Sequence, residues 1–142
     1  MFITRATRHD SDDLAKFFES QEWDDPILDK GVAFIARDGA VVGNVRLIEV
    51  EPNILVVEDV VVEESRRGQG LGARIMQAAM NSRGGTLYLC AHPPREEFYK
   101  RLGFTRVDFS ELPGGASLYF EEHGDAPHQL DPDHIHLFMK AR

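Results

Sequence analysis

The chain has 142 residues, enough for one domain with a hydrophobic core and short for two. Its formal net charge of −8 argues against a general binder of nucleic acid or of membrane surfaces, because both require a basic surface. Cys90 is the only cysteine, so the sequence predicts neither an internal disulfide nor a Cys-based zinc site, and the expected compartment is the cytoplasm. No apolar run approaches the roughly 20 residues that span a bilayer, and the first residues do not form a signal peptide.

The first part of the chain predicts a strand followed by a helix. Composition favours a short strand over residues 2–7, and the acidic and hydroxyl side chains that follow are typical of a helix start. The helix is expected over residues 11–20. It would bury one apolar side, formed by Leu14, Phe17 and Phe18.

A hairpin and a central strand are expected next. Residues 31–37 and 40–50 form the arms of the hairpin, and Asp38-Gly39 is a strong turn signal between them. After another turn, a valine-rich run over residues 54–63 predicts a central strand that is buried on both faces.

The second half of the chain is less regular. A strand is expected over 86–91, then a helix that starts at Pro94 and buries Phe98 and Leu102. Further strands are expected over 104–109 and 135–140. Between them, Leu112 to Gly115 predict a turn, residues 116–120 a short strand or a helical turn, and residues 121–133 a surface loop that is either functional or merely variable.

The most informative stretch joins the central strand to a helix through a glycine-rich loop. Gly68, Gly70 and Gly72 follow Arg66 and Arg67, and apolar residues then recur at helical spacing. Such a loop directs unpaired backbone N–H groups and the positive end of a helix dipole at one point, which predicts an anion site suited to a pyrophosphate. The alternative is an ordinary turn whose glycines only relieve strain. The spacing matches neither the dinucleotide fingerprint nor a Walker loop.

Two blocks of this chain resemble the GNAT N-acetyltransferase superfamily. Arg67-Gly68-Gln69-Gly70-Leu71-Gly72 is similar to its acetyl-CoA-binding motif R/Q-x-x-G-x-G/A, and Phe98 to Phe104 (FYKRLGF) is similar to its FYxxxGF signature. The resemblance extends over almost the whole chain. It implies a single α/β (α+β) domain over residues 1–142 with a mixed, mostly antiparallel sheet of six to seven strands and helices on both faces.

The resemblance also implies the residues that bind acetyl-CoA. The expected contacts come from the end of the central strand, the glycine loop and one later loop: Val60, Val61, Val62, Arg66, Arg67, Gly68, Gln69, Gly70, Leu71, Gly72 and His92. The sequence departs from the family where Asn and Ala are frequent, because His92 and Arg95 stand at those places. A role for His92 in binding the cofactor is one interpretation, and an exposed loop histidine is the other.

Two acidic residues interrupt the valines of the central strand. A buried carboxylate must be paired, open to a cavity or partly protonated, and in a regular strand Glu58 and Asp59 would point to opposite faces. The resemblance implies that Glu58 is the general base, directly or through water, with a structural ion pair as the alternative; Asp59 is interpreted as structural. It also implies that Tyr99 protonates the departing CoA thiolate, while free N–H groups near Val60 and Val62 polarise the acetyl carbonyl.

Two histidines near the C-terminus share a face of the last expected strand. His134 and His136 have a spacing that can hold a metal, but no third ligand is apparent in the sequence. They are interpreted as surface or core histidines, and no metal is predicted.

The resemblance implies transfer of an acetyl group from acetyl-CoA to a primary amine of a small molecule or peptide. The acceptor is expected between residues 23–29 and the C-terminal loop, where Asp24, Asp25, Glu121 and Glu122 would suit a polyamine, an aminoglycoside or a basic peptide. The competing hypothesis is a non-catalytic acyl-CoA-binding module that regulates a partner. No nucleic acid or membrane partner is predicted, and a homodimer is compatible with the family.

Overall fold

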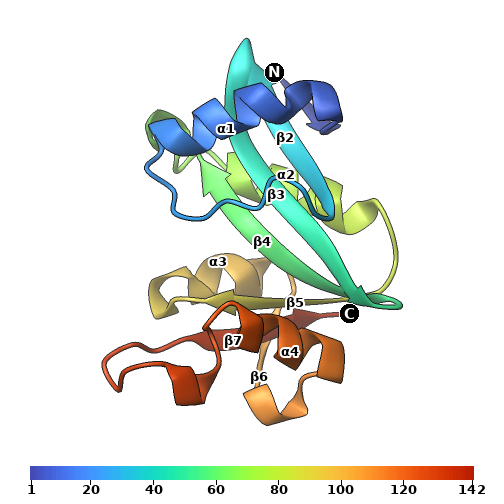
Figure 1. Ribbon diagram of the computed structural model, residues 1–142. Helices are drawn as coiled ribbons and strands as arrows, with labels where there is room; N and C mark the ends of the chain where they lie inside the picture. The colour runs from blue at the N-terminus through green and yellow to red at the C-terminus, as the bar shows by residue number, and fades with distance from the viewer. The chain divides into compact units, whose positions relative to one another are not determined.

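The computed structural model describes residues 1–142, and its seven strands form one mixed sheet in the order β1-β2-β3-β4-β5-β7-β6 (Figure 1). The strands are β1 (Phe2–Arg5), β2 (Val32–Asp38), β3 (Ala40–Glu51), β4 (Ile54–Val62), β5 (Thr86–Ala91), β6 (Thr105–Val107) and β7 (Leu137–Ala141). The helices are α1 (Ser11–Ser20), α2 (Leu71–Asn81), α3 (Glu96–Arg101) and α4 (Gly114–Glu122). None of these helices combines the length and the apolar composition needed to cross a membrane.

The chain divides into two compact units. One contains residues 1–48 and 57–83, and the other contains residues 49–56 and 84–142. The first unit therefore holds β1, α1, β2, α2 and most of β3 and β4, and the second holds the remaining elements.

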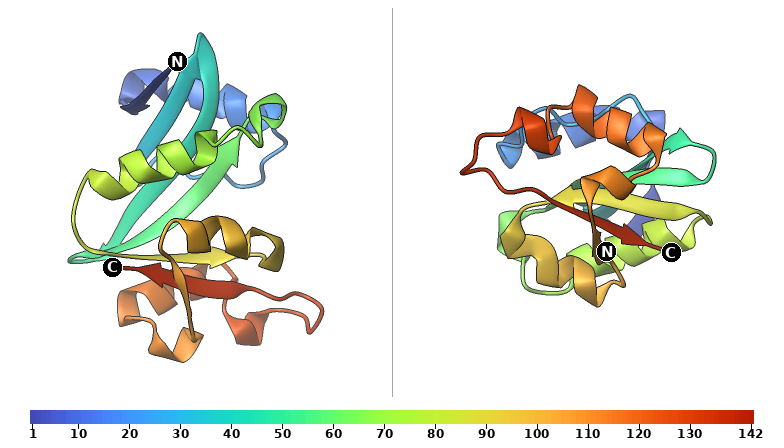
Figure 2. Two further views of the ribbon diagram at one scale, coloured as in Figure 1. Left: turned by 180° about the vertical axis from the view of Figure 1, so that it is seen from behind. Right: turned by 90° about the horizontal axis from the view of Figure 1, so that it is seen from below.

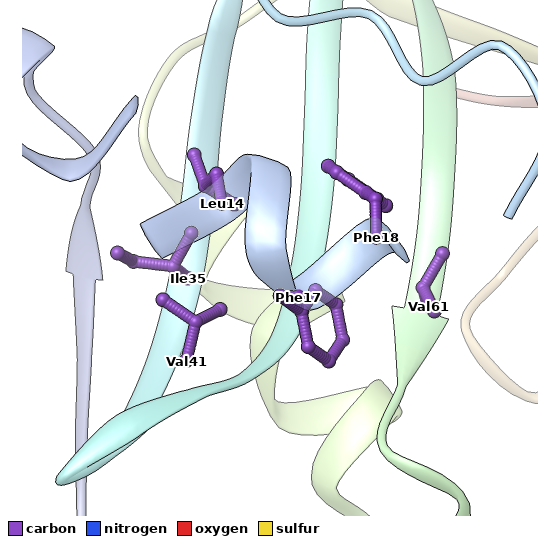
Figure 3. Close-up of a cluster of buried hydrophobic side chains, with 6 residues drawn as sticks. All are labelled: Leu14, Phe17, Phe18, Ile35, Val41 and Val61. Carbon is purple, nitrogen blue, oxygen red and sulfur yellow. The ribbon is translucent and has the colours of Figure 1, made fainter. Parts of the chain in front are cut away.

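In the first unit, α1 packs on one face of the sheet. Its apolar side meets side chains from three strands, as Figure 3 shows. The buried cluster consists of Leu14, Phe17 and Phe18 of α1 with Ile35, Val41 and Val61. This is the apolar side that the sequence predicted for this helix.

Helix α2 packs on the opposite face of the same strands. A Cβ built on Gly43 would lie 2.5 Å from Cδ1 of Ile75 and 3.7 Å from Cβ of Ala36, so these three residues share a face. Ala36 follows Ile35 in β2, and successive strand residues point to opposite faces. The predicted arrangement of helices on both faces is therefore confirmed in this unit.

In the second unit, β5 is parallel to β4 and antiparallel to β7, and β6 pairs with the other side of β7 (Figure 2). The parallel pairing joins Ile54–Val56 to Thr86–Tyr88. Phe120 of α4 packs against Phe138 of β7, with ring centroids 5.1 Å apart. In the first unit, β2 is antiparallel to both β1 and β3. Most of these strand pairs are thus antiparallel, as the sequence predicted.

Two predictions near the third helix were wrong in detail. Pro94 does not begin the helix, because Pro93–Arg95 form a 3₁₀ turn and α3 starts at Glu96. Tyr99 is the buried residue of α3, while Phe98 and Leu102, which were expected on the buried face, are half-buried. The strand predicted over 104–109 is shorter, Thr105–Val107, because the chain enters another 3₁₀ turn at Phe109.

The turn predicted at Gly114-Gly115 is the first turn of α4. The glycines serve a close approach, because a Cβ on Gly115 would lie 2.7 Å from Oε2 of Glu51 and 2.8 Å from the carbonyl oxygen of Val50. The N–H group of Gly115 donates to the Glu51 carboxylate at 2.7 Å. Of the two readings left open for residues 116–120, the helical one is confirmed.

Candidate active site

The glycine loop has the backbone conformation that the anion-site hypothesis requires. Strand β4 ends at Val62, and a 3₁₀ turn and the loop lead to Gly70, which caps α2. Gly68 and Gly70 have φ angles of 80° and 79°, a region that L side chains rarely adopt. A Cβ on either residue would meet no protein atom within 4 Å, so the space above the loop is open.

The start of α2 supplies unsatisfied donors to that space. No side chain caps the helix at Gly70, and the first N–H groups of any helix lack intrahelical acceptors. Together with the positive end of the helix dipole, such donors have the chemistry that a phosphate group requires. Leu71 contributes only its backbone, because its side chain is buried in the face of α2 that meets the sheet.

The two arginines of the loop have different surroundings. Arg66 donates to Asp38 at 2.8 Å and to Glu63 at 3.1 Å, and the hydrogen bond to Asp38 raises the pKa of the guanidinium. These two ion pairs join Arg66 to β2 and to the residue after β4, and its contact with the cofactor stays a prediction. Arg67 donates from Nε to the carbonyl oxygen of Val62 at 3.0 Å and is exposed, which leaves its charge beside the glycines.

A left-handed residue interrupts β4 just before its last three valines. Asp59 has a φ angle of 51°, so the regular alternation predicted for Glu58 and Asp59 is broken at this point. The buried carboxylate of Asp59 accepts hydrogen bonds from Trp23 Nε1 at 3.0 Å and from the Ile27 N–H at 2.7 Å. Nδ2 of Asn44 donates to the Asp59 carbonyl oxygen at 2.9 Å. These bonds support the structural role expected for Asp59.

Asp59→Ala is expected to lower the free energy of unfolding by about 3 kcal/mol, since hydrogen bonds to a charged group contribute about 1.5–3 kcal/mol each. The loss would appear as a lower urea midpoint at unchanged m-value. Asp24→Ala is the control, because Asp24 is exposed and lies in the segment that contains Trp23 and Ile27. This substitution should change stability little. An Asp59→Ala midpoint equal to that of the control would show that the two bonds contribute nothing.

The other predicted residues of β4 lie on either side of Asp59. Glu58 is half-buried and directly precedes it. Val61 packs its side chain into the cluster under α1, and the carbonyl oxygen of Val62 accepts the bond from Arg67. The side chain of Val61 is therefore not available to a ligand, whereas Val60 and Val62 are half-buried.

Tyr99 lies in the second unit on α3. It is 6% exposed, and its ring makes an edge contact with Phe104 at a centroid distance of 5.8 Å. The amide of Phe104 donates to the carbonyl oxygen of Tyr99 at 3.1 Å, which closes the helix onto the following strand. The second block of the sequence resemblance thus forms a compact helix end that fixes the tyrosine ring.

The second unit also contains a group of side chains that sequence reasoning did not bring together. One ligand atom each from Cys90, Asp125 and His136 lie within 4.8 Å of one another, a set that could hold a metal ion. The ring of His92 lies 5.1 Å from that of His136, while His134 is exposed. Burial raises the pKa of the Asp125 carboxyl. The sequence could not predict this group, because the three residues are far apart in the chain and Asp125 comes from the loop after α4.

A family model for the acetyltransferase (GNAT) domain matches residues 29–106, more than half of the chain. The chain belongs to the GNAT acetyltransferase family. No curated protein matches it significantly.

Solved structures share the fold of this GNAT protein at low sequence identity. An acyl-CoA N-acyltransferase from Pseudomonas aeruginosa is 21% identical, with full coverage of both chains and a TM-score of 0.69. An aminoglycoside 6'-N-acetyltransferase complexed with coenzyme A is 20% identical over 99% of this chain and 96% of that one, with a TM-score of 0.68. N-acetylglutamate synthase from Neisseria gonorrhoeae, complexed with coenzyme A and L-arginine, is 16% identical over 99% of this chain but only 32% of its own, with a TM-score of 0.72.

Proposed function

We propose that this GNAT protein transfers an acetyl group from acetyl-CoA to a primary amine of a small molecule or peptide. The observation that carries the proposal is the open, left-handed glycine loop at the uncapped start of α2. Its backbone donors and the exposed Arg67 suit the pyrophosphate of coenzyme A. The solved relatives that contain coenzyme A support the same ligand.

In this mechanism Glu58, directly or through a water, removes a proton from the ammonium group of the acceptor. The free amine attacks the thioester carbonyl carbon, whose oxygen is polarised by backbone N–H groups at Val60 to Val62. The C–N bond forms, the C–S bond breaks, and Tyr99 gives its proton to the departing thiolate. The nitrogen loses its second proton as the amide forms, and this proton restores the tyrosinate through water, while Glu58 releases the first proton to solvent. Holding both substrates in line supplies much of the acceleration.

The alternative is a non-catalytic acyl-CoA-binding module. It would use the same glycine loop but would need neither Glu58 nor Tyr99. Calorimetry with acetyl-CoA, followed by thiol release against a panel of amines, separates the two. Binding with turnover on one class of amine supports the enzyme, and binding without turnover on any amine supports the module. No binding would contradict both.

Tyr99→Phe should lower kcat about tenfold to a hundredfold, because the thiolate then departs without its proton donor. The dissociation constant for acetyl-CoA should stay within about twofold, since phenylalanine preserves the packing against Phe104. Thiol release and calorimetry on the same preparation measure the two quantities. Tyr88→Phe, at a buried tyrosine of β5, is the matched control and should retain full activity. Full activity in Tyr99→Phe would remove this residue from the mechanism.

A further inference from the structure

The first unit contains a recess of about 340 Å³ that is separate from the glycine loop. Its walls come from the end of β1, the start of α1, the segment that leads into β2, and β3. The charged side chains that line it are Arg5, Arg8, Asp29 and Arg46. Three cations thus face one carboxylate, in a protein whose net charge is −8.

Arg46 is the buried cation of this recess. It is 5% exposed, and its Nη1 donates to the carbonyl oxygen of Lys30, but its buried Nε has no hydrogen-bond partner. Burial lowers the pKa of Arg46, and the charges of Asp59 and Asp29 act against that shift. A guanidinium stays protonated in proteins, so a buried cation with an unused donor requires an acceptor.

Arg46 relates the recess to β4, the strand of the same unit that carries Glu58. Asn44 of β3 reaches the Asp59 carbonyl oxygen of β4, and Arg46 follows Asn44 by two residues, on the same face of the strand. Arg46 is also close enough to Asp59 for their charges to interact. A molecule bound at Arg46 would therefore contact β3, the strand next to the one that carries Glu58.

We propose that Arg46 binds an oxyanion, a carboxylate or a phosphate, on the amine acceptor, with Arg5 and Arg8 adding positive charge at the same recess. The planar guanidinium fork of Arg46 matches such groups and can give them a charge-assisted hydrogen bond. The inference rests on the proposed acetyl transfer and names its substrate class. It differs from the cationic acceptor expected from Asp24, Asp25, Glu121 and Glu122, which are all exposed and which the same panel of amines tests.

The test compares amines that differ only in the anion. One arm uses amino acids against their carboxamides, and the other uses phosphorylated amino sugars against the free amino sugars. The enzyme should prefer the charged member of one pair by about tenfold or more in kcat/KM, the discrimination expected when a buried donor loses its partner. The arm that shows the preference identifies the oxyanion as a carboxylate or a phosphate.

Arg46→Met should reduce that preference to about twofold or less, mainly through the acceptor KM, with acetyl-CoA binding unchanged. Lys16→Met makes the same change of charge at an exposed position of α1 outside the recess and should keep the preference. If Arg46→Met does not fold, Arg5→Met and Arg8→Met should each lower the preference instead.

Equal rates for both members of every pair, or a preference that survives in Arg46→Met, would overturn the inference. If no amine is acetylated, the proposed function fails and the recess is tested by calorimetry alone. The same amino acids and amino sugar phosphates are then titrated into the protein. Binding of the charged member that Arg46→Met abolishes would still support an oxyanion site, and the absence of binding would refute it.

Discussion

Glu58→Gln is expected to lower kcat for acetyl transfer by about a hundredfold to a thousandfold, the range for loss of a general base. Glutamine keeps the size and polarity of the side chain but cannot take a proton. Glu58 is half-buried in β4, and a glutamine of the same size can occupy its place. The substitution should therefore leave the fold and acetyl-CoA binding intact. Stopped assays of thiol release at saturating acetyl-CoA measure the effect.

The pH profile separates a base from a structural carboxylate. A general base must be deprotonated to act, so wild-type kcat/KM should fall on the acid side of the pH profile. The variant should lack that acid limb and keep only the dependence that comes from the amine of the acceptor. Glu64→Gln, at the exposed start of the loop, serves as the control. An unchanged profile in Glu58→Gln would transfer the role to another residue or to water alone.

The double variant Gly68→Ala/Gly70→Ala should weaken acetyl-CoA binding by about a hundredfold or more, as measured by calorimetry. Both glycines have φ angles near 80°, and a Cβ on either would project into space that no protein atom fills. The methyl groups would therefore collide with the ligand rather than with the protein. They would also hold the phosphate away from the N–H groups at the start of α2.

A matched control isolates this effect from backbone strain. Gly39 and Gly124 have φ angles of 76° and 75°, and a Cβ on them would likewise meet nothing within 4 Å. Gly39→Ala/Gly124→Ala should thus cost the same stability, about 1–2 kcal/mol per site, without changing the affinity for acetyl-CoA. Equal affinities in the two double variants would mean that the glycines of the loop serve only its turn.

The parts of the fold that could be predicted are those with local signals. The apolar period of α1 and the turn signal at Asp38-Gly39 depend on neighbours in the sequence, and both predictions hold. The start of α4 failed for the opposite reason. Two adjacent glycines predict a turn when only their neighbours in the sequence are considered. In the structure, Gly115 allows the helix to approach Glu51, which belongs to a distant segment of the chain.

The candidate site divides in the same way. The glycine loop could be predicted because its conformation and its donors lie within a few residues of one another. The partners of Asp59 could not, since Trp23 and Ile27 precede it by more than 30 residues. Nothing in the sequence around Arg46 indicated a binding site, because its strand mixes apolar and polar residues. Only the structure shows that Arg46 is buried and that its Nε has no hydrogen-bond partner.

The hydrogen bond between Trp23 and Asp59 also gives this protein a built-in optical probe. Trp23 is the only tryptophan, so the whole indole emission comes from a ring held by a carboxylate of β4 and packed beside the cluster under α1. The same carboxylate holds Ile27, whose next neighbours Leu28 and Asp29 line the recess around Arg46. An acceptor that binds at Arg46, as proposed, should therefore change the emission of this single fluorophore, and a titration of unlabelled protein would follow that binding before any bond is made.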